Sequence, residues 1–199
     1  MKLTVGTDST WSLRVWICSQ LVAVDVDINV IDLTHLDYKS EILKHSVTGL
    51  VPSLNEGTFV IHDSLAIAEF FNECSEGALY PDTISERALA RSLCAELHSG
   101  FMSLRSQCPF SLEHVTPLVE FNSDIKQELI RIENIFESAQ LPFMFKSAGV
   151  VDAFYSILAF RLNAYGIKLQ GKAGEYQESL LSWSKLQQAI ELAQRWKSA

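Results

Sequence analysis

The spacing of hydrophobic residues changes about a third of the way along the chain. In the first part, short apolar runs alternate with segments in which apolar residues recur every three or four positions, a pattern typical of alternating strands and helices. Leu3 to Gly6 is predicted to form a strand, Thr10 to Val24 an amphipathic helix, and Asp27 to Leu33 a second strand. Either Ser9 or Thr10 can cap that helix, because a hydroxyl oxygen there accepts a hydrogen bond from the first turn.

The segments that follow predict a short helix, a hairpin and a further helix. Lys39 to His45 has the composition of a short polar helix. Val51 to Leu54 and Thr58 to Ile61 flank Asn55-Glu56-Gly57, which predicts two antiparallel strands joined by a three-residue turn. Asp63 to Asn72 is predicted as a helix. A parallel strand–helix–strand unit followed by a hairpin is what a thioredoxin-like domain requires, although the order alone also fits other α/β folds.

The rest of the chain has the pattern of a helical bundle. The stretch from Cys74 to Ser85 lacks periodicity and contains Gly77 and Pro81, so it is predicted to be a linker. After it, helices are predicted at residues 85–107, 118–139, 150–165, 174–181 and 184–197. Residues 150–165 are apolar on nearly all sides, so this helix is expected at the buried centre of the bundle. The predicted fold is therefore an α/β domain at residues 1–74, a linker at 75–84 and an all-α domain at 85–199.

Charge and composition exclude several classes of function. The 199 residues carry a formal net charge of -8, and such a chain cannot neutralise a row of phosphates, which argues against nucleic-acid binding. The longest apolar stretch is interrupted by Asp152, so no membrane span is expected, and no signal peptide is recognised. The cysteines form no Cys-x-x-Cys pair and the histidines no cluster, so we expect reduced thiols, no metal ion and a cytoplasmic location.

Two polar segments adjoin predicted helix starts and are candidates for ligand chemistry. Ser9 and Thr10 join the first strand to the first helix, where unpaired amides and the positive end of the helix dipole favour an anion. A hydroxyl there that donates to a sulfur atom would stabilise a thiolate. Asp63 and Ser64 stand at the start of another predicted helix. All four are also ordinary helix-capping residues, so the pattern alone fits a purely structural role.

Pro52 stands at the start of a predicted strand, where a residue that cannot donate a backbone hydrogen bond is unusual. Without further information, a trans bond between Val51 and Pro52 is the default. A small ligand that meets the main chain at this point would explain the proline.

Together these segments resemble glutathione transferases. The run from Ser9 to Arg14 is similar to the Ser-Ser-x-Ser-x-Arg segment of zeta-type and related bacterial members, with Thr10 in place of the second serine. The resemblance implies that Ser9 activates the thiol of glutathione, with Thr10 second in line. It also implies that the Val51–Pro52 bond is cis and that the valine backbone pairs with glutathione like an added strand.

The same resemblance assigns the other contacts to glutathione. Ser64 would bind the γ-glutamyl carboxylate, and Asp63 would face the ammonium group of the same moiety. The family often has Lys or Gln two residues before the proline, where this chain has Leu50. His45 or Lys44 is therefore expected to hold the glycine carboxylate.

The second half of the chain resembles the family as well. Residues 91–105 are similar to the first bundle helix of a bacterial branch, and the run from Gly149 to Asp152 corresponds to the family's Ser-x-x-Asp capping box. The resemblance places the electrophilic substrate between the two domains, near Trp11, Phe101 and Arg105.

The sequence thus predicts a glutathione transferase, expected as a homodimer, with glutathione as co-substrate. Its thiol would attack a small electrophile, in a conjugation or a glutathione-dependent isomerisation. The alternative is a non-catalytic glutathione-transferase-like binding or interaction protein, which Leu50 favours and Ser9, Asp63 and Ser64 disfavour. A glutathione-dependent reductase lacks its nucleophile, because Cys18 lies two turns inside the first helix.

Overall fold

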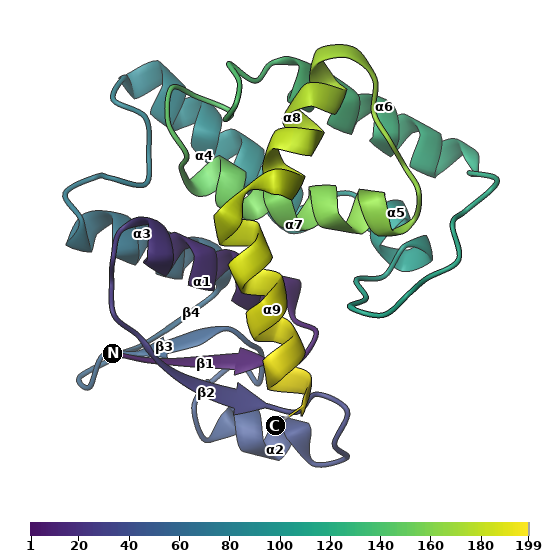
Figure 1. Cartoon of the computed structure of the whole chain (residues 1–199). Coiled ribbons are helices and arrows are strands. Elements are labelled where there is room, and N and C mark those ends of the chain that lie inside the picture. The colour runs from purple at the N-terminus through teal and green to yellow at the C-terminus, as the bar shows by residue number, and fades with distance from the viewer. Residues whose placement is uncertain (199) are drawn as a thin grey trace. The chain divides into compact units, whose positions relative to one another are not determined.

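The first part of the chain folds around a four-stranded mixed sheet. The structure is a computed structural model that describes residues 1–198. The strands are β1 (Lys2–Gly6), β2 (Asp27–Ile31), β3 (Ser53–Asn55) and β4 (Val60–His62), in the order β2-β1-β3-β4 (Figure 1). β1 runs parallel to β2 and antiparallel to β3, and β4 runs antiparallel to β3.

Helices cover both faces of this sheet. α1 (Thr10–Leu21) and α3 (Ser64–Cys74) lie side by side on one face, and α2 (Tyr38–Leu43) lies on the other, beside β2 (Figure 1). The core between sheet and helices contains fully buried apolar side chains, which include Leu3, Val5, Leu54, Ile67 and Phe71. The predicted thioredoxin-like order of elements is confirmed.

The hairpin between β3 and β4 is wider than the sequence predicts. Asn55 pairs with Val60, so residues 56–59 form a four-residue loop and the predicted three-residue turn is wrong. The side chain of Asn55 accepts a hydrogen bond from the amide of Gly57 at 2.7 Å, and Gly57 has a φ of +97°. The Glu56 amide also donates to the carbonyl oxygen of Phe59 at 3.1 Å, which closes the loop.

The second part of the chain is helical, as predicted. It contains α4 (Ile84–Ser99), α5 (Met102–Gln107), α6 (Ser123–Glu137), α7 (Val150–Ala164), α8 (Gly171–Ser182) and α9 (Ser184–Ser198). Residues 150–159 of α7 are all buried, which confirms the expectation that this helix forms the centre of the bundle.

Asp152 closes the N-terminus of α7. Its Oδ2 accepts a hydrogen bond from the Gly149 amide at 2.9 Å, and its Oδ1 accepts from the Met144 amide at 2.8 Å and the Tyr176 hydroxyl at 2.7 Å. The side chain is fully buried. Burial raises the pKa of this carboxyl, and the donors oppose that shift. The predicted capping role of Asp152, with Gly149 at the cap position, is confirmed.

The helix predicted at residues 85–107 is broken in two. Gly100 ends α4 with an extended backbone, and Phe101 has a φ of +57° before α5 begins. A Cβ at position 100 would lie 2.6 Å from the carbonyl oxygen of Glu96. Glycine is therefore the residue that lets the chain leave the helix here.

The next helix starts later than its apolar pattern suggests. α6 begins at Ser123 rather than Leu118. The side chain of Asn122 accepts a hydrogen bond from the amide of Ile125 at 2.9 Å, which caps the helix at this point.

Internal contacts divide the chain into two units. The first consists of Met1–Leu79 together with the chain from Gln188 onward, and the second of Tyr80–Gln187. The boundary falls inside α9, whose C-terminal part belongs to the unit that contains the sheet. No helix within residues 1–198 has the length and apolarity needed to cross a membrane.

Candidate functional site

Loops that are distant in the sequence meet at one edge of the sheet. The strand register pairs Thr4 with Ser53 and Ser53 with His62. Because β3 runs opposite to both of its neighbours, the end of β1, the start of β3 and the end of β4 lie at the same edge. The segments attached to these ends are Ser9–Thr10, Val51–Pro52 and Asp63–Ser64. The topology thus brings together the segments in which the sequence predicts a ligand site.

Gly6 keeps two of these loops close together. A Cβ at this position would lie 2.7 Å from Leu33 Cδ1 and 2.9 Å from Val51 Cγ2. The carbonyl oxygen of Gly6 accepts a hydrogen bond from the Ser9 amide at 3.2 Å. Glycine at this position therefore permits both the approach of Val51 and the turn that leads into α1.

Ser9 caps α1 and belongs to a chain of hydroxyl hydrogen bonds. Its Oγ accepts from the Ser12 amide at 3.3 Å and from the Ser12 hydroxyl at 3.0 Å, while Ser12 Oγ accepts from the Gly6 amide at 3.3 Å. Ser9 therefore still has its own proton to donate. Because each bond in such a chain polarises the next, this proton is a better donor than that of an isolated serine. The positive end of α1 adds a field that favours an anion at this point.

Thr10 occupies the first position of α1, and its hydroxyl has no hydrogen bonds like those that Ser9 accepts from Ser12. It is buried, and its Oγ1 has no hydrogen-bond partner among residues 1–198. Neither a donor nor an acceptor of the described chain orients this hydroxyl. The arrangement therefore favours Ser9 over Thr10 as the group that acts on a thiol.

The next turns of α1 carry Trp11, Arg14 and Cys18. The Arg14 guanidinium lies 5.6 Å from the centre of the half-buried Trp11 ring. Cys18 is fully buried, and burial raises the pKa of its thiol, with Arg14 opposing the shift. This thiol stays protonated at neutral pH, so it is not available as a nucleophile.

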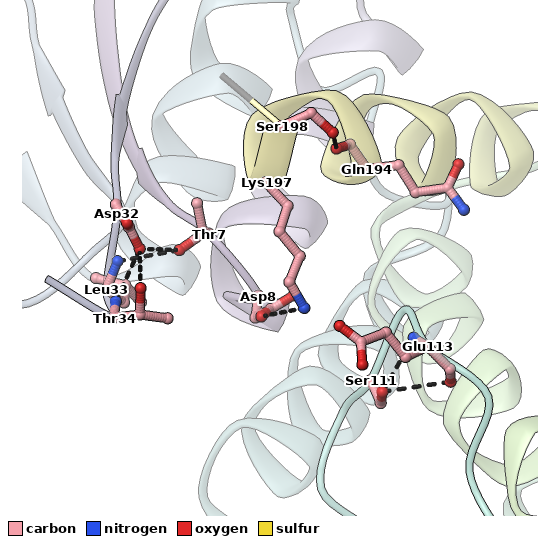
Figure 2. A network of polar contacts seen from close by, with 10 residues as sticks. All are labelled: Thr7, Asp8, Asp32, Leu33, Thr34, Ser111, Glu113, Gln194, Lys197 and Ser198. Carbon is pink, nitrogen blue, oxygen red and sulfur yellow. Dashed lines mark hydrogen bonds and ion pairs between the residues drawn. The ribbon is translucent and has the colours of Figure 1, made fainter.

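The loop that leads to Ser9 is anchored on two sides (Figure 2). Thr7 donates to Asp32 Oδ1 at 3.5 Å and accepts from the Leu33 amide at 3.0 Å. Asp8, with a φ of +58°, forms an ion pair with Lys197 of α9, Oδ2 to Nζ at 3.3 Å. These contacts fix the direction in which the chain enters α1.

The Val51–Pro52 segment presents its main chain to the same edge. The bond between these residues is cis, as the resemblance implies. Val51 lies just outside β3, and neither its amide nor its carbonyl has a hydrogen-bond partner in the described part of the chain. An extended ligand can pair with these groups in the way that an added strand does.

Asp63 and Ser64 form the start of α3. Asp63 has a φ of +79°, and its Oδ1 accepts from the Leu65 amide at 2.8 Å, so it caps the helix while its side chain stays exposed. Ser64 is the first helical residue and is 1% exposed. An α-amino acid group suits this place, because its carboxylate can meet the helix N-terminus and its ammonium the Asp63 carboxylate.

His45 lies in the connection between α2 and β3. Its carbonyl oxygen accepts a hydrogen bond from the Ser53 hydroxyl at 3.0 Å, which ties the end of α2 to the start of β3. His45 also lines a cavity of about 240 Å³ beside β2 and α2, together with His35 and Tyr38. Leu50, by contrast, is 68% exposed and offers no polar group.

The two substrate residues predicted in the helical unit lie in and next to α5. Phe101 is 7% exposed and immediately precedes the helix. Arg105 donates to the carbonyl oxygens of Leu97 and His98, which ties α5 to the end of α4. Burial lowers the pKa of Arg105, and the nearby charge of Glu128 opposes that shift.

Known proteins share this architecture. Residues 8–74 match the family model described as "Glutathione S-transferase, N-terminal domain". This segment is therefore similar to the N-terminal domain of glutathione transferases. A glutathione transferase homologue from Burkholderia gl BGR1, solved with bound glutathione, is 23% identical with a TM-score of 0.71, over 98% of this chain and 97% of that chain. Poplar glutathione transferase F1 is 14% identical with a TM-score of 0.74, over 98% of each chain.

A bacterial enzyme of the zeta class is similar to the same extent. Maleyl pyruvate isomerase is 16% identical with a TM-score of 0.71, over 95% of this chain and 96% of that chain. These similarities establish the glutathione transferase fold for the whole chain. A search of curated protein sequences gives no significant match.

The structure adds Ser12 and Gly6 to the candidate site. Sequence reasoning missed Ser12, although the spacing of Ser9 and Ser12 puts both hydroxyls on one side of the first turn. The part played by Lys197 has no sequence signal, because it comes from the far end of the chain. Within residues 1–198, no group of three or more His, Cys, Asp or Glu side chains is placed to hold a metal ion.

Proposed function

We propose that this protein is a glutathione transferase in which Ser9 activates the thiol of bound glutathione. The observation that carries the proposal is the Ser9 hydroxyl, which accepts from both groups of Ser12 and keeps its proton for a ligand. A thiol with a pKa of about 8.5 is mostly protonated at neutral pH. A hydrogen bond to a charged group contributes about 1.5–3 kcal/mol, which lowers the thiol pKa by about 1–2 units.

Glutathione would lie along the sheet edge. The main chain of Val51, next to Pro52, pairs with the cysteinyl part, and Asp63 and Ser64 hold the γ-glutamyl group. His45 holds the glycine carboxylate in this proposal. Lys44 is the weaker candidate, since its ammonium already lies 2.6 Å from Glu41 Oε1.

The second substrate is a small electrophile that the thiolate attacks, in a conjugation or an isomerisation. Trp11, Phe101 and Arg105 are its proposed contacts, and the active protein is a homodimer. Size-exclusion chromatography with light scattering tests the oligomeric state, because a protein that stays monomeric at assay concentration contradicts the dimer.

Thermal shift measurements with glutathione and S-hexylglutathione test the binding site. A ligand that binds only the folded state raises the melting temperature by mass action, so both compounds are expected to raise it. The hexyl compound is expected to give the larger shift, because its chain adds apolar contact. Absence of a shift with either compound contradicts the glutathione site.

Turnover of a generic aryl halide separates the transferase from a non-catalytic binding protein. The exposed Leu50, where a polar contact to glutathione is absent, is the observation that favours the second function. Conjugate formation that depends on Ser9 supports the transferase. Glutathione binding without any turnover supports the binding protein instead.

A further inference from the structure

The loop in front of α1 places a carboxylate next to Ser9. Asp8 immediately precedes Ser9, so the Cα atoms of the two residues lie about 3.8 Å apart. Asp8 has a φ of +58°, in the left-handed region that Gly, Asn and Asp tolerate best. Its Oδ1 is buried and has no hydrogen-bond partner among residues 1–198. A negative charge, partly shielded from water, is therefore held close to the hydroxyl that is proposed to act on a thiol.

The far end of the chain supplies a partner for this carboxylate. Lys197 lies near the end of α9 with its Nζ 3.3 Å from Asp8 Oδ2, and Figure 2 shows the side chain reaching from the helix to the loop. This part of α9 and the loop belong to the same unit of the chain. Within residues 1–198, no other hydrogen bond or ion pair reaches the Asp8 carboxylate. Lys197 is thus the described side chain that neutralises this charge.

Other charged groups of this sheet edge are held by different contacts. Asp32 Oδ1 accepts from the Thr34 amide at 2.8 Å and from its hydroxyl at 2.7 Å. Asp63 caps α3, and the Arg14 guanidinium lies over the ring of Trp11. The remaining titratable side chains of the segments that meet here and of the end of α9 are those of Cys18, Lys44, His45, His62 and Arg195. Asp8 is the charged residue that adjoins Ser9 in the chain, so Lys197 decides how much negative charge stands there.

A carboxylate without its partner at this position opposes the formation of a thiolate. Like charges a few ångströms apart disfavour each other, and water screens them incompletely where one is partly buried. The carboxylate also interacts with the same positive end of α1 that favours the thiolate. Asn would fit the backbone of position 8 without any charge. The chain instead has a carboxylate there and an ammonium group beside it, so the charge of this loop depends on the end of α9.

We propose that Lys197 is a positioning residue for thiol activation, which holds Asp8 and cancels its charge so that a thiolate can form beside Ser9. This inference rests on the proposed function of Ser9. Lys197 acts through Asp8 and takes no part in the reaction itself. The end of α9 thereby contributes to the reactive fraction of the glutathione thiol.

Titration of the ultraviolet absorbance of the bound thiolate in Lys197→Met, in Asp8→Asn and in the double variant tests this. Lys197→Met leaves the Asp8 carboxylate without its counter-charge, so the thiol pKa should rise by about half a unit to one unit. Asp8→Asn keeps a residue that tolerates the backbone but leaves the ammonium group unpaired, so the thiol pKa should fall by a similar amount. The double variant carries neither charge and should titrate close to the wild-type complex.

Two further variants are the controls. Lys197→Arg keeps the positive charge and should titrate like the wild type. Lys2→Met changes the net charge by the same amount, but Lys2 is exposed and begins β1 at the end opposite to the α1 loop, so the thiol pKa should not change. Salt screens a charge that has lost its partner, so the raised pKa of Lys197→Met should approach the wild-type value at high ionic strength. A partly exposed ion pair contributes little stability, so Lys197→Met should keep the wild-type melting temperature.

The same thiol pKa in the wild type, Lys197→Met and Asp8→Asn overturns the proposal, as does a raised pKa that persists in the double variant. If Lys197→Met does not fold, Asp8→Asn decides, because its thiol pKa must fall. A wild-type complex without a lowered thiol pKa, or one that Ser9→Ala leaves unchanged, overturns the proposed function and this inference together. A lowered pKa that depends on Ser9 but not on Lys197 overturns this inference alone.

Discussion

The starts of α1 and α7 use similar capping chemistry but differ in what they leave open. At α7, the buried carboxylate of Asp152 accepts hydrogen bonds from two amides and a hydroxyl of the same unit. At α1, the Ser12 hydroxyl accepts a hydrogen bond from the Gly6 amide and donates one to Ser9 Oγ. The proton of the Ser9 hydroxyl therefore remains available to a ligand. A helix start whose polar groups are all matched within the protein stabilises the fold. A helix start with a hydrogen-bond donor that the protein itself does not use can donate to a ligand.

The difference predicts where substitutions show their effect. Changes at the start of α7 should appear in the free energy of unfolding. Changes at the sheet edge, where α1 and α3 begin, should appear mainly in glutathione chemistry, with only the modest stability cost of a helix cap.

Asp152→Ala is expected to have the largest effect. It leaves the Met144 and Gly149 amides and the Tyr176 hydroxyl without their acceptor. Each buried, unsatisfied group costs about 1–3 kcal/mol, so the free energy of unfolding should fall by roughly 3 kcal/mol or more. Urea unfolding followed by circular dichroism measures it. Asp152→Asn keeps the volume and one acceptor, and should lie between wild type and alanine. A loss below about 1 kcal/mol for alanine contradicts the matched network.

Asp63 caps α3 and, in the proposed function, also binds glutathione, and two substitutions separate these roles. Asn caps a helix about as well as Asp, so Asp63→Asn should leave the melting temperature unchanged. The lost charge should raise the KM for glutathione about tenfold, the lower end of the value of a hydrogen bond between charged groups. Asp63→Ala should show the same KM and in addition lose about 1 kcal/mol of stability. An unchanged KM in Asp63→Asn means that Asp63 is only a cap.

Ser12→Ala is expected to have the smallest effect, because Ser12 acts through Ser9. Losing one polarising hydrogen bond of roughly 0.5–1.5 kcal/mol should lower kcat/KM about threefold to tenfold. Ser19→Ala is the matched control, since its buried hydroxyl on the same helix donates to the Trp16 carbonyl. Ser19→Ala should leave kcat/KM unchanged. An equal loss in both variants would assign the effect to α1 packing.

Much of the fold could be predicted because local signals agreed with the final structure. The alternation of β1, α1 and β2 and the apolar surface of α7 follow from periodicity, and the cap of α7 from Asp152. The predicted bounds of the hairpin loop and of two helices were wrong because single residues there had more effect than the periodicity of apolar residues. The side chains of Asn55 and Asn122 bond to nearby amides, which competes with regular structure in the hairpin and delays the start of α6. Gly100 divides the predicted helix for another reason, because without a Cβ its backbone can leave the helix beside the Glu96 carbonyl.

The residues of the candidate site that belong to short sequence motifs could be predicted. Ser9, Pro52 and Ser64 occupy recognisable places next to strands and helix starts. The pairing of Asp8 with Lys197 was not predictable, because it joins opposite ends of the chain and leaves no local pattern.

The pKa of the glutathione thiol in the complex tests the central claim most directly. It is measured by titrating the ultraviolet absorbance of the bound thiolate in the wild-type protein and in Ser9→Ala. The wild-type complex should titrate about 1–2 units below the ordinary value of about 8.5, because the Ser9 hydroxyl donates to the sulfur. In Ser9→Ala the pKa should return close to the value of free glutathione. The same lowered pKa in both proteins would contradict the assignment of Ser9.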